Sequence, residues 1–533
     1  MSVPSSVIHI LSGVPVNSSY EHSLYFPTKF QQITYFTSKK VKTLSNFTYI
    51  RPSNSIKVAG DVANARTWNY LMFQNDTGKW YYNFIDKVTY LSDSSVELHI
   101  TMDVIQTYMF DWDLKPCFVE RTHTRSDEFG EHTVPEGMET GPLISSGQYD
   151  IDLEDNCILL LMSCNKNGGQ AWGKAYGGVY SGLAVYAVQL SDVSNLNTWL
   201  QQASTGGYID AIVSMWMYPK KLVNISGSWT DGETLHIVSN VADTFEVSVT
   251  DSLYDADSVA GQRVNNRKTL CYPYTMLYLS NNMGGCATFR RELFDPDTPG
   301  EYHFQVMGAL SPDSGVQLVP KHYKQRAGNQ FNFEESVSLP AFPTCAWNSD
   351  TYKVWLAQNQ NTHALTQKQA VIQAGAGAVA SVASAFTGNI VGSVGGLATA
   401  YSALTSVQNL MAQKADMAIQ PDQARGTHSG NINLTHGRMG FTFYTMTVTA
   451  EYAKMIDDYF TRYGYQVNTI EVPSLYNREL FTYVKTAGCT VTGSLGAEDQ
   501  VRIQSIFDRG ITFWADPAQV GEYFNTNRPL SEV

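Results

Sequence analysis

A long stretch without charge constrains this chain more than any other feature. Between Lys368 and Lys414 there is no Asp, Glu, Lys or Arg, and Ala, Gly, Ser, Val and Thr make up most of the segment. Gly388 and Asn389 favour a turn and divide the segment into two arms, each near the ~17–25 residues that span the apolar core of a bilayer. Small residues bury little area, so the stretch favours membrane or lumen packing over the alternative, a buried core hairpin.

Both arms, 369–388 and 389–413, carry apolar residues at helical spacing. Steps of three and four place these residues on one face of each arm and predict a helical hairpin. Gly392 and Gly396 stand four apart, the spacing at which helices approach closely in lipid. Because Ala and Gly make the arms only weakly hydrophobic, we expect conditional insertion rather than a permanent anchor. The residues predicted to enter the membrane are Ile372, Val379, Val382, Phe386, Ile390, Val394, Leu397, Tyr401, Leu404 and Met411.

Composition favours a particle-forming β protein over a cytosolic enzyme. Charged residues make up 16% of the 533 positions, against ~25% in ordinary soluble proteins. The chain is rich in aromatic residues, with 31 Tyr and 24 Phe. A net charge of −13 provides no positive field for phosphates, so tight binding along DNA is not expected, although a duplex could slide past carboxylates.

The cysteines and the N-terminus point to assembly in a cytoplasm. The seven Cys residues are far apart and form no paired framework, so we expect reduced and mostly buried thiols. The first basic residue is Lys29, so we expect no Sec signal peptide.

Local patterns predict mostly strands, with a few helices. Alternation from Val96 to Met102 predicts a strand, and the polar run 92–95 before it predicts a hairpin. Further strands are expected at 158–162, 183–190 and 441–449, and a short helix at 196–202. A longer helix is predicted from Ala450 to Tyr463, ending at Gly464. Its expected core-facing residues are Tyr452, Met455, Ile456, Tyr459, Phe460 and Tyr463.

Each candidate for a catalytic, nucleotide-binding or metal-binding motif departs from the pattern that the motif requires. The segment 168–175 has the spacing of a phosphate loop, but Ala175 stands where Ser or Thr must hold Mg²⁺. His123 and His132, with three acidic residues between them, match no zinc pattern. The acidic loops at 255–257 and 295–297 depart from calcium loops and are explained by turns. We therefore expect no catalytic residue, no metal, no cofactor and no enzymatic activity.

Several aromatic-rich strings give the chain a family resemblance. The strings are Leu11–Phe26, Asn69–Asp76, Lys79–Leu91, Met102–Trp112, Cys117–His123, Pro273–Asn282, Trp355–Asn361, Glu451–Tyr465 and Ile506–Trp514. Together they look like the distal tail, or tail-knob, proteins of small short-tailed bacteriophages (podoviruses) of Gram-positive hosts, and the match is weakest between His123 and Pro273.

The resemblance implies a mainly β, multi-domain subunit of a hexameric ring at the distal end of the tail. It also implies a long hydrophobic loop that plugs the lumen, enters the host cytoplasmic membrane and opens a path for DNA ejection. The implied partners are the other copies of the homo-hexamer, adjoining tail or collar proteins, the host membrane, and genomic DNA that passes without tight binding.

In the family the hydrophobic loop lies at the position of the uncharged stretch. This position divides the chain into the expected domains. They are a β-rich tube domain at 1–146, middle β-rich domains at 147–350, the hydrophobic loop with its flanks at 351–430 and an α+β tube segment at 431–533. A receptor-binding or wall-degrading tail protein remains the alternative. An enzyme, however, needs a convergent polar site, and a receptor binder has no need of a hydrophobic hairpin.

Overall fold

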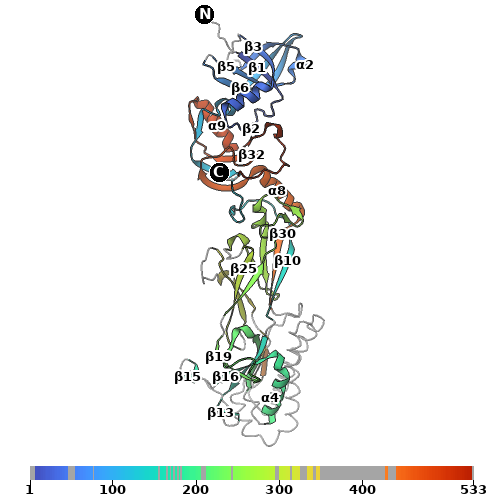
Figure 1. Ribbon diagram of the computed structural model, residues 1–533, viewed down its shortest axis with the longest axis vertical. Coiled ribbons are helices and arrows are strands. Elements are labelled where there is room, and N and C mark those ends of the chain that lie inside the picture. Colours follow the sequence, from blue (N-terminus) through green and yellow to red (C-terminus); the bar gives the residue numbers. More distant parts are fainter. Residues whose placement is uncertain are drawn as a thin grey trace. The chain divides into compact units, whose positions relative to one another are not determined.

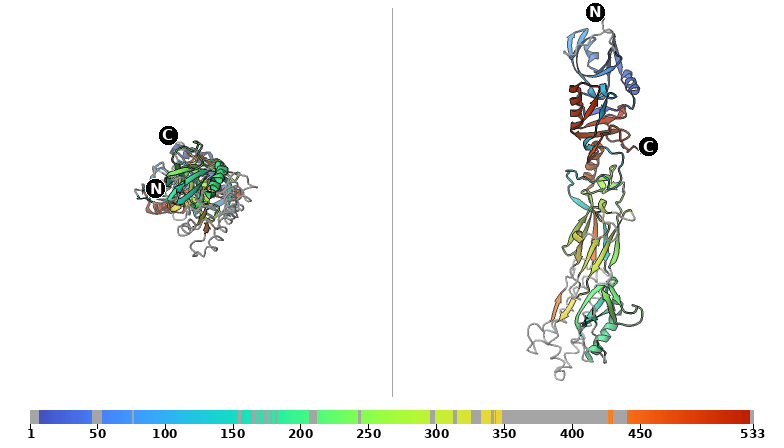
Figure 2. Two further views of the ribbon diagram at one scale, coloured as in Figure 1. Left: turned by 90° about the horizontal axis from the view of Figure 1, so that it is seen from below. Right: turned by 90° about the vertical axis from the view of Figure 1, so that its left-hand side faces the viewer.

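The structure is a computed structural model (Figures 1 and 2). The chain forms two compact units, Met1–Pro142 with Asp255–Tyr274 and Val448–Val533, and Leu143–Tyr254 with Thr275–Thr447. The predicted mainly β, multi-domain fold is confirmed, whereas the four domain boundaries stay predictions. The structure describes residues 7–45, 54–75, 77–153, 156–163, 166–167, 170–171, 175–176, 179–180, 183–205, 212–241, 244–294, 299–311, 315–324, 333–339, 342, 344–347, 426–429 and 440–530.

The first unit contains a six-stranded antiparallel sheet in the order β3-β1-β5-β6-β7-β4. Val96, Leu98 and Ile100 of β7 are buried in alternation with less buried neighbours, as predicted. The expected hairpin is also confirmed, since Ser92 pairs with Ser95 across the turn between β6 and β7. The strands are β1 (Val7–Ser12), β3 (Lys40–Ser45), β4 (Ser55–Ala59), β5 (Trp68–Gln74), β6 (Trp80–Ser92) and β7 (Ser95–Met102).

Short helices cover this sheet, namely α1 (Lys29–Ser38), α2 (Val62–Ala65) and α3 (Val104–Tyr108). Asp103 begins α3 by accepting a hydrogen bond from the Gln106 backbone N–H at 3.1 Å. It also accepts one from the Tyr70 hydroxyl at 2.8 Å. Burial raises the pKa of Asp103 to about 6, because it disfavours the charged carboxylate.

A second sheet of the first unit combines strands from both ends of the chain, in the order β2-β34-β32-β9-β31. β2 pairs in parallel with β34, which lies almost five hundred residues later. The core packs Leu24 and Tyr20 together with Phe481 and Trp514. The strands are β2 (His22–Leu24), β9 (Cys117–Thr122), β31 (Tyr465–Glu471), β32 (Phe481–Ala487) and β34 (Ile511–Trp514), and the helices α8 (Ala450–Tyr463) and α9 (Ala497–Arg509) belong to the same unit.

The second unit contains a seven-stranded sheet, β18-β19-β16-β11-β17-β28-β29, and two four-stranded sheets, β10-β30-β23-β24 and β20-β25-β26-β27. β11 (Asn156–Ser163), β16 (Leu183–Gln189) and β30 (Gly440–Val448) confirm three predicted strands, and α4 (Val193–Thr205) extends the predicted helix at both ends. The other strands of these three sheets are β10 (Leu143–Asp152), β17 (Ile212–Pro219), β18 (Val223–Ile225), β19 (His236–Val241), β20 (Phe245–Thr250), β23 (Thr275–Ser280), β24 (Cys286–Phe289), β25 (Glu301–Gly308), β26 (Val316–Pro320), β27 (Val337–Leu339), β28 (Thr344–Trp347) and β29 (Gly426–Ser429).

The predicted limits of α8 are confirmed, but only two of its six predicted core residues are fully buried. Tyr452, Tyr459 and Tyr463 are half-buried. The helix runs from Ala450 to Tyr463 and ends at Gly464. Ile456 and Phe460 are buried, whereas Met455 is 51% exposed because it lies at the edge of the apolar face. The buried face instead includes Asp457.

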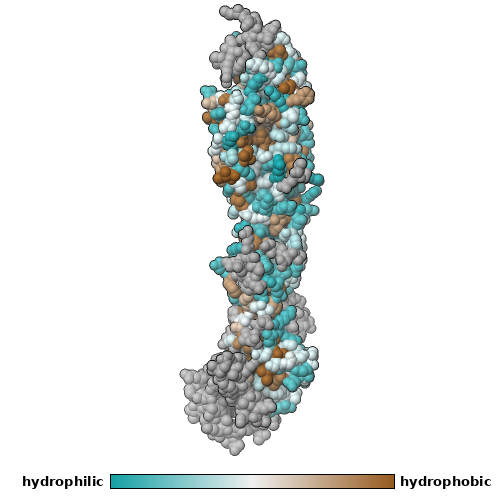
Figure 3. All heavy atoms as spheres, turned by 60° about the vertical axis from the view of Figure 1, so that its left-hand side comes forward, coloured by the Kyte–Doolittle hydropathy of each residue, from teal (hydrophilic) through white to brown (hydrophobic). Residues whose placement is uncertain are grey.

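The described surface is mixed in polarity. On the face drawn in Figure 3, apolar residues lie singly or in small groups among polar ones. Four of the cysteines are buried free thiols, whereas Cys286 is exposed. Within the described residues, no helix combines the length and the apolar character needed to cross a membrane.

Candidate functional site

The two strands that flank the uncharged segment pair with each other. β28 and β29 are antiparallel, with Thr344 opposite Ser429 and Trp347 opposite Gly426. The chain between them, residues 348–425, therefore leaves and rejoins the sheet at adjacent positions. The predicted membrane-insertion residues between 369 and 413, and the turn at Gly388 and Asn389, lie outside the described residues.

The β28–β29 pair forms the base of residues 348–425. β28 connects this base to the core of the second unit. It pairs with β17, where Trp216 lies opposite Thr344 and is buried. β29 ends the strand order of the sheet. The intervening chain is thus an insertion at a sheet edge, and a change within it need not disturb the pairs that hold the sheet.

The cluster formed by His123, His132 and the acidic residues between them makes local hydrogen bonds. The His123 ring is buried, with Nε2 3.0 Å from the Thr461 carbonyl oxygen. Its Nδ1 accepts a hydrogen bond from the Tyr483 N–H at 2.8 Å. Burial, reinforced by the nearby Arg478 charge, lowers the pKa of His123 to about 3, so the ring is neutral at neutral pH.

The other members of that cluster also have local roles. His132 Nε2 lies 3.0 Å from the Thr124 hydroxyl and 2.9 Å from the Ser126 carbonyl. Asp127 accepts a hydrogen bond from the Tyr465 hydroxyl at 2.6 Å. Across the ranges that the structure describes, no three His, Cys, Asp or Glu side chains converge as metal ligands.

Only part of the remaining motif candidates lies within the described residues. Asp255 forms an ion pair with Arg267 at 3.0 Å, which is a structural role. The acidic loop at 295–297 and most of the segment 168–175 lie outside the described residues.

The first unit also contains a buried ionic cluster that the sequence did not predict. Glu136 accepts hydrogen bonds from Lys268 Nζ at 2.6 Å and from the Gln466 N–H at 2.8 Å, and it forms an ion pair with Arg121. Arg121 also donates to the Gly464 carbonyl at 2.6 Å. Three distant chain segments are therefore connected by charges that are largely removed from water.

Asp457 makes a second buried junction in the same unit. Its Oδ1 accepts hydrogen bonds from the backbone N–H groups of Asn265 and Asn266, both at 2.9 Å. The Asn266 side chain also donates to Thr461 Oγ1 at 2.8 Å. The carboxylate thereby attaches the segment 265–266 to α8.

The fold and these contacts define a structural β protein, in which buried polar residues hold distant chain segments together. A family model described as the C-terminal domain of the tail knob protein gp9 of Bacillus phage phi29 matches residues 239–528. A second model, the N-terminus of caudoviral major tail proteins, matches residues 4–113.

Whole-chain relatives agree with these models. The chain is 24% identical to the tail knob protein gp9 of Bacillus phage B103, over 98% of both chains. It is 23% identical to that of Bacillus phage phi29, over 95% of this chain and 96% of the relative. The bacteriophage C1 tail knob protein gp12 shares the fold, with a TM-score of 0.67 at 12% identity, over 98% of this chain and 100% of that one.

The chain therefore belongs to the family of podovirus tail knob proteins represented by gp9 of phage phi29. It is a structural component of the virion at the distal end of the tail, part of a multi-subunit tail assembly, and it is not an enzyme.

Proposed function

We propose that six copies of this chain form a closed ring, the distal tail tube through which genomic DNA is ejected. In this proposal residues 369–413 plug the lumen before ejection and then insert into the host cytoplasmic membrane. The rest of the chain supplies the wall of the tube and contacts adjoining tail or collar proteins.

The observation that carries the proposal is the paired base of an uncharged insertion. β28 and β29 hold the two ends of residues 348–425 side by side, so the segment can change its surroundings while the sheet stays intact. The arms 369–388 and 389–413 contain no charged residue. A single central charge would cost roughly 2.5–3.5 kcal/mol on membrane-insertion scales.

Dye release from liposomes tests the membrane step. Wild-type protein should release the dye, whereas the double variant Val382→Asp with Leu397→Asp should release much less, because each arm would carry a carboxylate into lipid. A variant that lacks residues 370–412 should also be inactive. Both variants should still fold and assemble, which circular dichroism and electron microscopy would check.

A matched control places the same two charges outside the segment. Ile470 on β31 and Val501 on α9 are 79% and 63% exposed, so Asp at both positions adds the same charge to the described surface. This control should release dye like the wild type. Equal leakage from all the proteins would show that residues 369–413 are not the membrane-active element and would favour a buried hairpin.

A further inference from the structure

Two buried cysteines of the first unit lie next to each other, although they are far apart in the sequence. Cys117 begins β9 and is 7% exposed, and Cys489 follows β32 and is 4% exposed. Neither of them is in a disulfide. Their thiol groups are within hydrogen-bonding reach of each other, and both side chains belong to the same apolar core. The proposed function assigns no role to this cysteine pair.

The backbone on both sides of the cysteine pair keeps one antiparallel register. β9 pairs with β32, and Phe118 lies opposite Ala487. Beyond the ends of these two strands, the Lys115 N–H donates to the Thr490 carbonyl at 3.0 Å, which continues the same register. The two cysteines therefore lie diagonally across from each other, one residue out of register.

This placement suits a disulfide. Opposed Cα atoms of antiparallel strands are ~4.5–5.5 Å apart, and one residue along a strand adds ~3.3 Å at right angles. Diagonal neighbours therefore fall within the ~4.4–6.8 Å that a disulfide bridges. In a regular strand the two side chains would face opposite ways, but Gly488 has a φ of 69° and interrupts the alternation directly before Cys489. Both thiols can therefore enter the same core.

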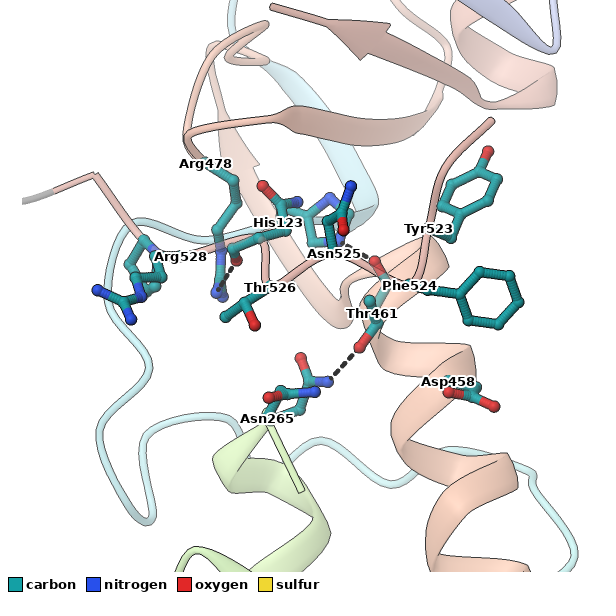
Figure 4. Close-up of a pocket in the computed structure, with 13 residues that line it drawn as sticks. His123, Asn265, Asp458, Thr461, Arg478, Tyr523, Phe524, Asn525, Thr526 and Arg528 are labelled. Atoms are coloured by element: carbon teal, nitrogen blue, oxygen red, sulfur yellow. Dashed lines mark hydrogen bonds between the residues drawn. The ribbon is translucent and has the colours of Figure 1, made fainter. Parts of the chain in front are cut away.

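Burial protects the cysteine pair from rapid oxidation. It raises the pKa of Cys489 to about 12 and also raises the pKa of Cys117, because it disfavours the thiolate, which is the reactive form. A cavity of about 130 Å³ in the same unit does not expose the pair, since none of its lining residues is a cysteine (Figure 4). An oxidant must reach the pair through local opening of the chain, so the reaction is slow.

We propose that Cys117 and Cys489 are a latent disulfide site, which closes after the virion has left the reducing cytoplasm of the host. The oxidant is a low-molecular-weight disulfide. The thiolate of one cysteine attacks this reagent and releases one small thiol, and the other cysteine then attacks the mixed disulfide and releases the second. Two electrons and two protons pass from the cysteine pair to the reagent, whose S–S bond is replaced by the new one.

The bond joins chain segments that come from opposite ends of the sequence. It ties the start of β9 to the residues that follow β32, within the sheet that combines both ends of the chain. A cross-link that closes a long loop restricts the unfolded chain more than one that closes a short loop. The first unit is therefore harder to unfold in the released particle than in the cytoplasm.

Incubation of the reduced, full-length protein with hydroxyethyl disulfide tests the proposal. After days in a mildly alkaline buffer below the Tm, mass spectrometry of proteolytic fragments should find Cys117 joined to Cys489. The Tm should rise by several degrees, and reduction with dithiothreitol should reverse both changes. The exposed Cys286 reports on the reagent, because it should carry a mixed disulfide early in the incubation.

Three variants separate the cysteine pair from other thiols. Cys117→Ser and Cys489→Ser should show no rise in Tm on oxidation. Cys271→Ser is the matched control, because Cys271 is another buried cysteine of the first unit, and this variant should keep the rise. A wild-type protein in which Cys286 has reacted, while Cys117 and Cys489 remain thiols or carry separate mixed disulfides, would overturn the proposal. That result requires no variant to fold.

Discussion

Gly464 occupies a position where no other residue fits without strain. Its φ is 64°, and an added Cβ would lie 2.3 Å from the Thr122 carbonyl oxygen. The close approach lets Arg121 donate to the Gly464 carbonyl. This glycine is therefore required by the contact between α8 and β9, and also by the end of the helix.

Gly464→Ala should destabilise the protein by at least ~2 kcal/mol, since backbone strain and a clash with main-chain atoms combine. Gly488→Ala is the matched control, because its φ is 69° but no atom lies within 4 Å of the added Cβ. That substitution should cost only about 1 kcal/mol. Urea denaturation measures both effects, and equal losses would show that the contact with β9 does not matter.

His123 should make the protein sensitive to acid. Its pKa is about 3 in the folded chain and ~6.5 when unfolded. Between these values the unfolded state binds the extra proton, so stability falls as the pH drops below ~6.5, by up to ~1.4 kcal/mol per unit.

His123→Gln removes this titration. The stability difference between the wild type and the variant should therefore change between pH 7 and pH 5, in the direction that penalises the wild type at pH 5. Taking the difference cancels Asp103, whose raised pKa has the opposite effect. A difference that stays constant with pH would contradict the prediction.

At the scale of elements, α8 has some features that follow from its local sequence and others that depend on tertiary contacts. Its limits follow from apolar spacing and a terminal glycine, both of which are local signals. The role of Asp457 could not be predicted, because its partners, Asn265 and Asn266, lie nearly two hundred residues earlier in the chain. The sequence of α8 contains three acidic residues, and Asp457 is only one of them.

Asp457→Ala should cost roughly 2–4 kcal/mol, because buried backbone and amide donors would lose their acceptor. The neighbouring Asp458 is exposed, so Asp458→Ala should change stability by no more than ~0.5 kcal/mol. Thermal unfolding of the two variants measures the contrast. Similar melting temperatures for both would refute the role assigned to the Asp457 junction.

At the scale of the whole molecule, the proposed ring and the net charge make linked predictions. A conduit requires an interface that closes on itself, so native mass spectrometry should show a closed oligomer, which we expect to be a hexamer. Only monomers under assembly conditions would contradict the ring.

The assembled protein should bind duplex DNA poorly, because its net charge is −13. A gel-shift assay at low salt measures this binding. Tight and salt-sensitive binding would indicate many phosphate contacts and would contradict a lumen that lets DNA pass.

The sequence alone determined the features that depend on neighbours in the chain. Alternation specified β7, because successive side chains of a strand face opposite ways. The absence of charge between Lys368 and Lys414 is likewise a property of the sequence, and it carries the proposal for membrane insertion.

Only the tertiary structure decided which distant residues meet. The pairing of β2 with β34, the cluster around Glu136 and the junction at Asp457 all join residues far apart in the sequence. With 49 acidic and 36 basic side chains, no local signal selects these partners. The energy of a charge depends on the water removed from it and on the groups that replace that water, and only the folded chain fixes both.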